Sequence, residues 1–192
     1  MASLRLSRVI SGRKRHRPRE SIAEGRARRG AIDDPEVVLA AALRFLEARP
    51  RSAAEVRRRL TGAGYREELV AGAIERLAEL GILDDEAFAR AWIESRDRAR
   101  PRGERALRSE LFRKGIDRQL ADDVLDERAT EQPDADAAAA RRVLERHANA
   151  LARVADPRAR RQRAYALLAR SGFDSETAVE AIAATFPRDS EG

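Results

Sequence analysis

The stretch that decides the fold is RGERALRSELFRKGID, residues 102–117. It is rich in arginine, yet Leu107, Leu111 and Ile116 recur at the spacing of an apolar helix face. Gly115 stands directly before Ile116, and glycine readily adopts the left-handed conformation that ends many helices. The stretch therefore predicts an amphipathic helix that stops at a glycine turn.

The same arrangement occurs three times along the chain. In each copy a leucine lies four residues before a glycine, a large apolar residue follows the glycine directly, and another apolar residue lies nine positions further on. The glycines are 51 and 57 residues apart. The three sets are Leu60, Gly64, Tyr65 and Ile74; Leu111, Gly115, Ile116 and Leu125; and Leu168, Gly172, Phe173 and Ile182. We interpret each set as the corner between the second and third helices of a three-helix unit, so the sequence predicts an all-α tandem repeat.

Local signals in the first copy support this interpretation. Asp34 followed by Pro35 is typical of a helix start, and Ser52 with Glu55 three residues later forms a capping box. No alternating β-branched run appears, so we expect no sheet. Three-helix repeats are expected over residues 32–83, 84–130 and 131–192.

Residues 1–31 differ from the rest of the chain in charge. They carry ten Arg and Lys residues against Glu20 and Glu24, whereas the whole chain has a net charge of only +6. The segment contains few large apolar residues, so burial cannot offset the entropy lost on ordering. We expect a disordered basic arm that either contacts nucleic acid or is a solvated tail.

The residue types argue against an enzyme. The chain has no cysteine, and its two histidines, His16 and His147, lie far apart in sequence. No phosphate-binding glycine loop is present, and the acidic cluster at residues 84–86 opens a helix, where carboxylates cap free N–H groups. We expect no catalytic residue, metal or cofactor. No run of about 18 apolar residues suggests a membrane span, and a cytoplasmic location is expected.

A binding protein remains, and the basic second helices are the candidate contacts. Arginines on them either present one charged surface to a partner or form a solvated face paired with neighbouring glutamates. The candidates are Arg57, Arg58, Arg102, Arg105, Arg108, Lys114 and Arg161.

Two aromatic residues of the central unit are further candidates, one for a contact and one for the core. Phe112 lies next to the expected core residue Leu111, on the flank of Arg108. A residue in this place more often packs against the adjacent unit, but it can also stack on a base or fill a pocket of a partner. Trp92 shares a helix face with Phe88, so we expect it in the core.

The segment DDEAFARAWIESRDRARPRGERALRSELFRKGI, residues 84–116, resembles the central signature of the RecX regulatory proteins. The flanking units, from about residue 34 to residue 186, are similar to the outer repeats of that family. The matching residues are Asp84, Phe88, Ala89, Arg96, Gly103, Leu107, Leu111, Lys114, Gly115 and Ile116.

This resemblance implies a function. RecX proteins bind the RecA recombinase and the nucleoprotein filament that it forms on single-stranded DNA. They lie in the groove of the filament and restrain its growth, which inhibits ATP hydrolysis, strand exchange and cleavage of the SOS repressor in DNA repair and homologous recombination. They are not enzymes. The resemblance also implies an elongated, curved array of three three-helix units, which we expect to act as a monomer.

Two other classes stay open. Three-helix units are similar to helix-turn-helix modules, so the chain could bind duplex DNA directly. Against this, the third helices, which would read the bases, carry many acids: Glu67, Glu68, Asp122, Asp123, Glu176 and Glu180. The other alternative is a helical scaffold for a different partner, and weak direct DNA binding is compatible with all three classes.

Overall fold

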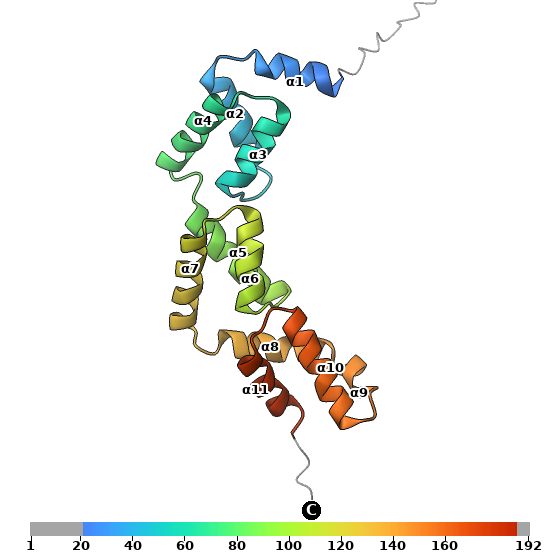
Figure 1. Ribbon diagram of the computed structural model, residues 1–192. Coiled ribbons are helices and arrows are strands. Elements are labelled where there is room, and N and C mark those ends of the chain that lie inside the picture. Colours follow the sequence, from blue (N-terminus) through green and yellow to red (C-terminus); the bar gives the residue numbers. More distant parts are fainter. Residues whose placement is uncertain (1–20, 188–192) are drawn as a thin grey trace, which may run out of the picture.

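The computed structural model describes residues 21–187, and all regular secondary structure in that range is helical. Figure 1 shows the helices arranged as an elongated, curved array of three units, preceded by the single helix α1. The prediction of an all-α tandem repeat is confirmed.

Each unit surrounds its own small apolar core. Val56, Leu60 and Leu77 are buried in the core of unit 1, Leu107, Leu111 and Leu125 in that of unit 2, and Leu144, Leu168 and Phe173 in that of unit 3. A core built from about 50 residues is marginal by itself, so contacts between the units matter for stability.

The three units are built from the following helices. Unit 1 contains α2 (Pro35–Leu46), α3 (Ala53–Ala63) and α4 (Glu67–Glu79). Unit 2 contains α5 (Asp85–Ala99), α6 (Glu104–Lys114) and α7 (Arg118–Glu131). Unit 3 contains α8 (Ala135–Arg146), the short α9 (Ala148–Ala152), α10 (Pro157–Arg170) and α11 (Ser175–Thr185).

The three glycine corners have the same geometry. Gly64, Gly115 and Gly172 all have positive φ, of 105°, 82° and 91°. In each corner the residue after the glycine donates its backbone N–H to the carbonyl of the repeated leucine, at 3.1–3.2 Å, which satisfies a free carbonyl at the helix end. The repeated leucine and glycine thus define one helix-ending motif, used three times.

Unit 1 meets unit 2 at the N-terminus of α3. Ser52 Oγ donates to the carbonyl of Lys114 at 2.6 Å, and the backbone N–H of Ala53 donates to Asp85 Oδ1 at 2.8 Å. Gly115 packs so closely that a Cβ on it would collide with the Cβ of Ala54. The corner glycine of unit 2 is therefore also the contact surface for unit 1.

Unit 2 meets unit 3 in the same way, at the N-terminus of α6. The N–H of Gly103 donates to the carbonyl of Ser171 at 3.1 Å, and the N–H of Glu104 donates to Asp136 Oδ2 at 3.0 Å. A Cβ on Gly172 would collide with Ala106. Each junction thus joins the start of a second helix to the glycine corner of the following unit.

The structure corrects the N-terminal arm. Residues 21–31 are not disordered, because α1 (Ile22–Gly30) forms with a capping box between Ser21 and Glu24. Arg26 Nη1 donates to the carbonyl of Gly62 at 3.0 Å, and Arg29 Nη1 donates to the carbonyl of Ala63 at 3.1 Å. These arginines satisfy carbonyls at the C-terminal end of α3, which explains how a helix with little apolar surface is held. The remaining part of the arm, residues 1–20, lies outside the described residues.

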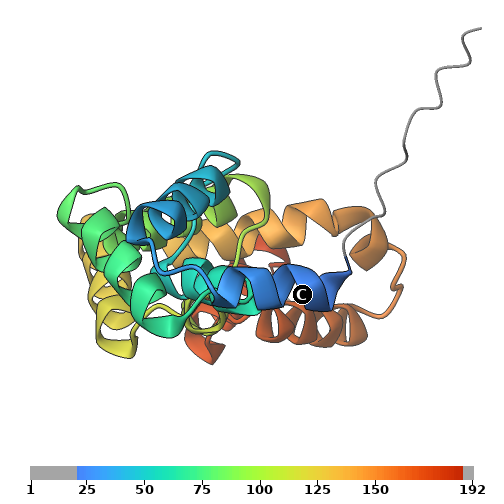
Figure 2. The ribbon, with the colours of Figure 1, turned by 90° about the horizontal axis from the view of Figure 1, so that it is seen from above.

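Helix α1 occupies the place of a preceding unit. A Cβ on Gly64 would lie 2.7 Å from the carbonyl oxygen of Arg26, so the first glycine corner also receives a helix. Seen from above in Figure 2, α1 lies across the end of the array. At the other end, α10 has 14 residues rather than the 11 of α3 and α6, and its Arg160 bonds to the carbonyl of Val154. Both ends of the array therefore differ from its internal junctions.

Candidate functional site

Helix α6, in the middle of the array, exposes one continuous stripe. Arg105, Ser109, Phe112 and Arg113 are exposed, and their positions i, i+4, i+7 and i+8 place them on the same side of the helix. Leu107 and Leu111 on the opposite side are fully buried. We call these four exposed residues the α6 surface.

Phe112 is the most unusual residue of the α6 surface. Its exposed fraction is 70%, so the expectation that it packs against the adjacent unit is wrong. The ring borders a shallow pocket of about 340 Å³, and arginines stand on either side of it. The lining residues are Arg105, Arg108, Ser109, Phe112, Ile116, Arg118 and Ala121. An exposed aromatic ring with arginine neighbours is a combination that binding interfaces favour.

Three further predicted contacts belong to unit 2, and each has an internal partner. Arg108 bonds to Glu104 at 2.7 Å and to Asp122 at 2.6 Å, which ties α6 to α7. The hydrogen bond to Asp122, followed by that to Glu104, raises the pKa of Arg108. Arg102 lies with its Nε 3.8 Å from Glu110 Oε1, and Lys114 bonds to Glu55 across the junction. Arg105 is the only one of the four predicted cations of unit 2 without a described partner.

The remaining candidates lie in the outer units. Arg57 forms an ion pair with Glu67 on the neighbouring helix. Arg161 donates to the carbonyls of Phe186 and Pro187, which lie directly after the C-terminal end of α11. Arg58 is exposed, and its Nη1 lies 3.7 Å from the position that a Cβ on Gly115 would take. Arg57 and Arg161 therefore also have partners within their own units.

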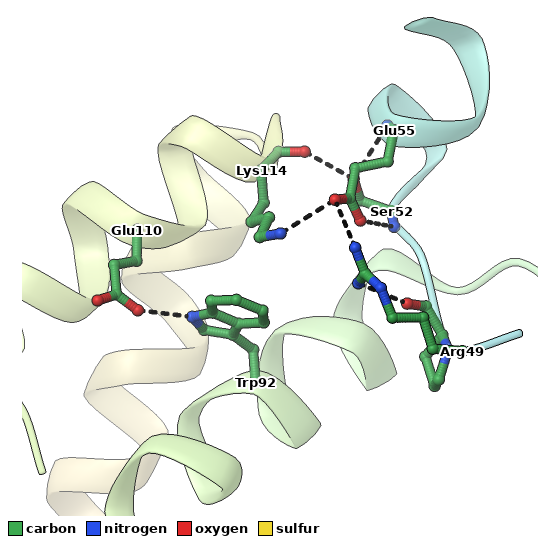
Figure 3. Close-up of polar contacts among 7 residues, drawn as sticks. Arg49, Ser52, Glu55, Trp92, Glu110 and Lys114 are labelled. Atoms are coloured by element: carbon green, nitrogen blue, oxygen red, sulfur yellow. Dashed lines mark hydrogen bonds and ion pairs between the residues drawn. The ribbon is translucent and has the colours of Figure 1, made fainter. Parts of the chain in front are cut away.

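A charged network fixes the position of α6 relative to α3 and α5 (Figure 3). Trp92 Nε1 and Arg96 Nε both donate to Glu110 Oε2, at 3.0 and 2.6 Å. The side chains of Arg96 and Lys114 lie over the ring of Trp92, at 4.3 and 4.4 Å from its centroid. Trp92 is thus half-buried at the edge of the unit 2 core, where it stacks on Phe88, and its indole N–H bonds to Glu110.

The two acids of the junction respond differently to their surroundings. Burial by itself raises the pKa of Glu55, but the hydrogen bond and charge of Lys114, the N–H of Ser52 and the charge of Arg49 together lower it. Burial dominates for Asp85 and raises its pKa, against the hydrogen bond from Ala53. Glu55 is thus stabilised in its ionised form, and Asp85 is not.

Sequence reasoning did not select Arg113 and Arg118 as contacts, although both border the surface of unit 2. Arg113 lies eight residues after Arg105, so a helical projection of the exposed side alone would have found it. Arg118 starts α7, and its side chain is 86% exposed. Arg118 lies beside Phe112 because of the turn at Gly115. The sequence predicts that a turn occurs there, but not its geometry.

Residues 21–187 contain neither a metal-binding cluster nor a helix that could span a membrane. No group of three or more His, Cys, Asp and Glu side chains there is arranged to hold a metal ion. No helix in the same range is long and apolar enough to span a membrane.

Comparison with known proteins identifies two segments of the chain. Residues 39–77 match the family described as "RecX, first three-helix domain", and residues 84–125 match "RecX, second three-helix domain". The second match contains all of α6, including the α6 surface.

Relatives with the name "Regulatory protein RecX" are similar over different lengths. The protein of Mycobacterium sp. (strain JLS) is 47% identical over 78 residues, which cover 41% of this chain and 43% of the relative. The aligned part is thus less than half the length of this relative. Longer alignments exist with the proteins of Chlorobium phaeobacteroides and Mycobacterium bovis. Both are 33% identical, over 73% and 81% of this chain and 88% and 90% of the relatives.

Two solved structures share the fold. The crystal structure of RecX from Lactobacillus salivarius has a TM-score of 0.64 at 22% identity, over 78% of this chain and 95% of the other. A second structure, described as regulatory protein RecX, has a TM-score of 0.66 at 21% identity, over 83% of this chain and 73% of the other.

Proposed function

Because the chain belongs to the RecX family of regulatory proteins, we propose that it binds the RecA recombinase and the filament that RecA forms on single-stranded DNA. In this proposal the protein is a non-enzymatic monomer. It restrains filament growth and thereby inhibits ATP hydrolysis, strand exchange and cleavage of the SOS repressor.

The shape of the molecule is the observation that carries the proposal. An elongated array with a core in each unit can follow a groove over a greater length than a globule of the same mass. The junctions fix the units to one another through backbone hydrogen bonds. Such an array reaches the filament already shaped, which reduces the entropy lost on binding.

We place the central contact on the α6 surface. Phe112 is 70% exposed, so burying its ring against RecA gains apolar contact. Arg105 has no ion pair or hydrogen bond among the described residues, so its guanidinium is available for an acidic group of RecA or a phosphate. Arg102, Arg108, Lys114, Arg57, Arg58 and Arg161 remain proposed contacts; all except Arg58 also have internal partners.

The proposal is tested by titrating the protein into DNA-dependent ATP hydrolysis by the cognate RecA. We expect progressive inhibition that saturates. No inhibition at any ratio would contradict the proposal. Sequence-specific binding to duplex DNA without RecA would instead favour the helix-turn-helix class.

The contact is tested with Phe112→Ala and Arg105→Ala in the same assay. Interface residues of these types contribute about 2 kcal/mol or more, so each change should raise the half-inhibitory concentration about tenfold or more. Val179→Ala is the matched control, because Val179 is an exposed apolar residue (59%) on α11 of unit 3. Equal inhibition by all variants, with unchanged circular dichroism, would remove the α6 surface from the interface.

A further inference from the structure

A second charged site lies in the pocket between units 1 and 2. The pocket has a volume of about 330 Å³, and its walls come from α3, α5 and α6. Four of its residues are basic and two are acidic. The lining residues are Glu55, Arg58, Trp92, Arg96, Glu110, Arg113 and Lys114, and we call this the junction pocket.

The inner wall of the junction pocket is neutralised by its own ion pairs. Lys114 Nζ lies 3.0 Å from Glu55 Oε1, and Arg96 Nε lies 2.6 Å from Glu110 Oε2. Both carboxylates are nearly buried, with side chains only 13% and 11% exposed. Neither acid is therefore available to neutralise a cation at the pocket mouth.

The mouth of the pocket is formed by two arginines that have no such partners. Arg58 on α3 and Arg113 on α6 are both exposed. Between residues 21 and 187, neither has an ion pair or a hydrogen bond. Arg58 extends across the junction, because its Nη1 lies close to the Gly115 corner that ends α6. Two guanidinium groups from different units therefore face one pocket without a counter-charge.

We propose that the junction pocket binds a phosphate group between Arg58 and Arg113. The forked donors of arginine match the oxygens of a phosphate, and two such groups can hold one anion from two sides. A phosphodiester of a single-stranded nucleic acid and a free phosphate such as pyrophosphate share this chemistry.

A bound phosphate would have a structural consequence. Its oxygens would bridge α3 of unit 1 and α6 of unit 2, beside the contact of Ala54 with Gly115. It would thus add another contact to a junction already held by Ser52, Asp85 and the ion pair of Lys114 with Glu55. The phosphate site shares Arg113 with the α6 surface and Arg58 with the proposed contacts. Its test contains no RecA, so failure of the phosphate site can be distinguished from failure of the proposed regulatory function.

The test uses the only tryptophan of the chain, Trp92, which lines the pocket. Its fluorescence is followed while pyrophosphate, and separately an oligothymidine, is added at constant ionic strength. We expect a saturable change with at least one probe. Arg58→Ala combined with Arg113→Ala should weaken binding about tenfold or more, because charged hydrogen bonds are lost. Arg98→Ala should bind as the unchanged protein does, since Arg98 is exposed on α5 but does not line the pocket.

Titration calorimetry on the same samples detects binding of a probe even when the fluorescence of Trp92 does not change. No saturable signal by either method with either probe would overturn the proposal, as would equal affinity in the double variant and the Arg98→Ala control. Competition between the two probes would assign both to one site. Binding of the oligothymidine alone would identify the nucleic-acid backbone as the source of the phosphate.

Discussion

Gly115 combines two roles. Its positive φ ends α6, and its missing side chain leaves room for Ala54 of the preceding unit. The sequence predicted the first role, because the spacing of leucine, glycine and apolar residue is local. The second role depends on a residue 61 positions earlier in the chain, which no local pattern reveals.

The two roles of Gly115 can be separated by comparison with Gly81. Gly81 also has a positive φ, of 65°, but a Cβ on it would have nothing within 4 Å. Gly81→Ala should therefore lower the unfolding free energy, measured in urea, only by the cost of a left-handed backbone with a side chain, about 1–2 kcal/mol. Gly115→Ala should lose a further amount of about 1–3 kcal/mol from overpacking against Ala54.

A second substitution, Ala54→Gly, checks this explanation. It should recover part of the extra loss in a double-mutant cycle with Gly115→Ala. Equal losses for Gly81→Ala and Gly115→Ala would show that the contact with Ala54 does not matter for stability.

Glu55 makes the junction sensitive to acid. Its pKa in the folded protein is below the ordinary value of 4.5, so its ionised form stabilises the fold above that pH, and this contribution is lost as the pH falls through the lowered value. Asp85 acts in the opposite direction, since burial raises its pKa and protonation relieves the cost of its charge. Glu55→Gln should therefore flatten the fall in unfolding free energy below about pH 4.5.

The measurement is urea unfolding at a series of pH values, followed by the fluorescence of Trp92. Other carboxylates with lowered pKa, such as Glu24 and Asp174, contribute equally to both proteins, so the difference between the two curves isolates Glu55. Parallel curves would mean that the bond between Lys114 and Glu55 adds nothing to stability.

At the scale of elements, local signals predicted most helix starts in unit 1 but not α1. Asp34 and Ser52 cap their helices as expected, through bonds to Glu36 and Glu55. Helix α1 was not predicted because its sequence lacks the apolar face that marks a packed helix. It is held instead by Arg26 and Arg29 against the end of α3. The exposure of Phe112 was likewise not predictable, since it depends on where the next unit docks.

The role of α1 leads to a prediction about two shortened chains. A chain that starts at Ser21 keeps α1, whereas a chain that starts at Ile32 lacks it. The second should be less stable than the first by on the order of 1–2 kcal/mol, because carbonyls at the end of α3 lose their charged donors. Thermal unfolding by circular dichroism measures the difference.

The paired substitution of Arg26 and Arg29 by alanine in the full chain is the control. It should reproduce most of the loss, since it removes the donors and leaves the length unchanged. Identical unfolding of the two shortened chains would show that α1 is not part of the folded array.

For the whole molecule, the repeat predicts the number of units and their shared corner, but not their relative orientation. That orientation is set by hydrogen bonds between residues far apart, such as Ser52 with Lys114 and Gly103 with Ser171. The two internal junctions have the same plan, and the array that they build is elongated and curved (Figure 1). The position of α6 at the centre of this array is one reason why we propose the α6 surface as the central contact.

The most direct test of this account is a photo-crosslink from the α6 surface to the filament. Phe112 is replaced by the photoreactive analogue benzoylphenylalanine, and the protein is irradiated with the cognate RecA on single-stranded DNA. We expect a covalent adduct with RecA that appears only when the filament is present and that excess unmodified protein suppresses. Inhibition of RecA without any adduct from this position would contradict it.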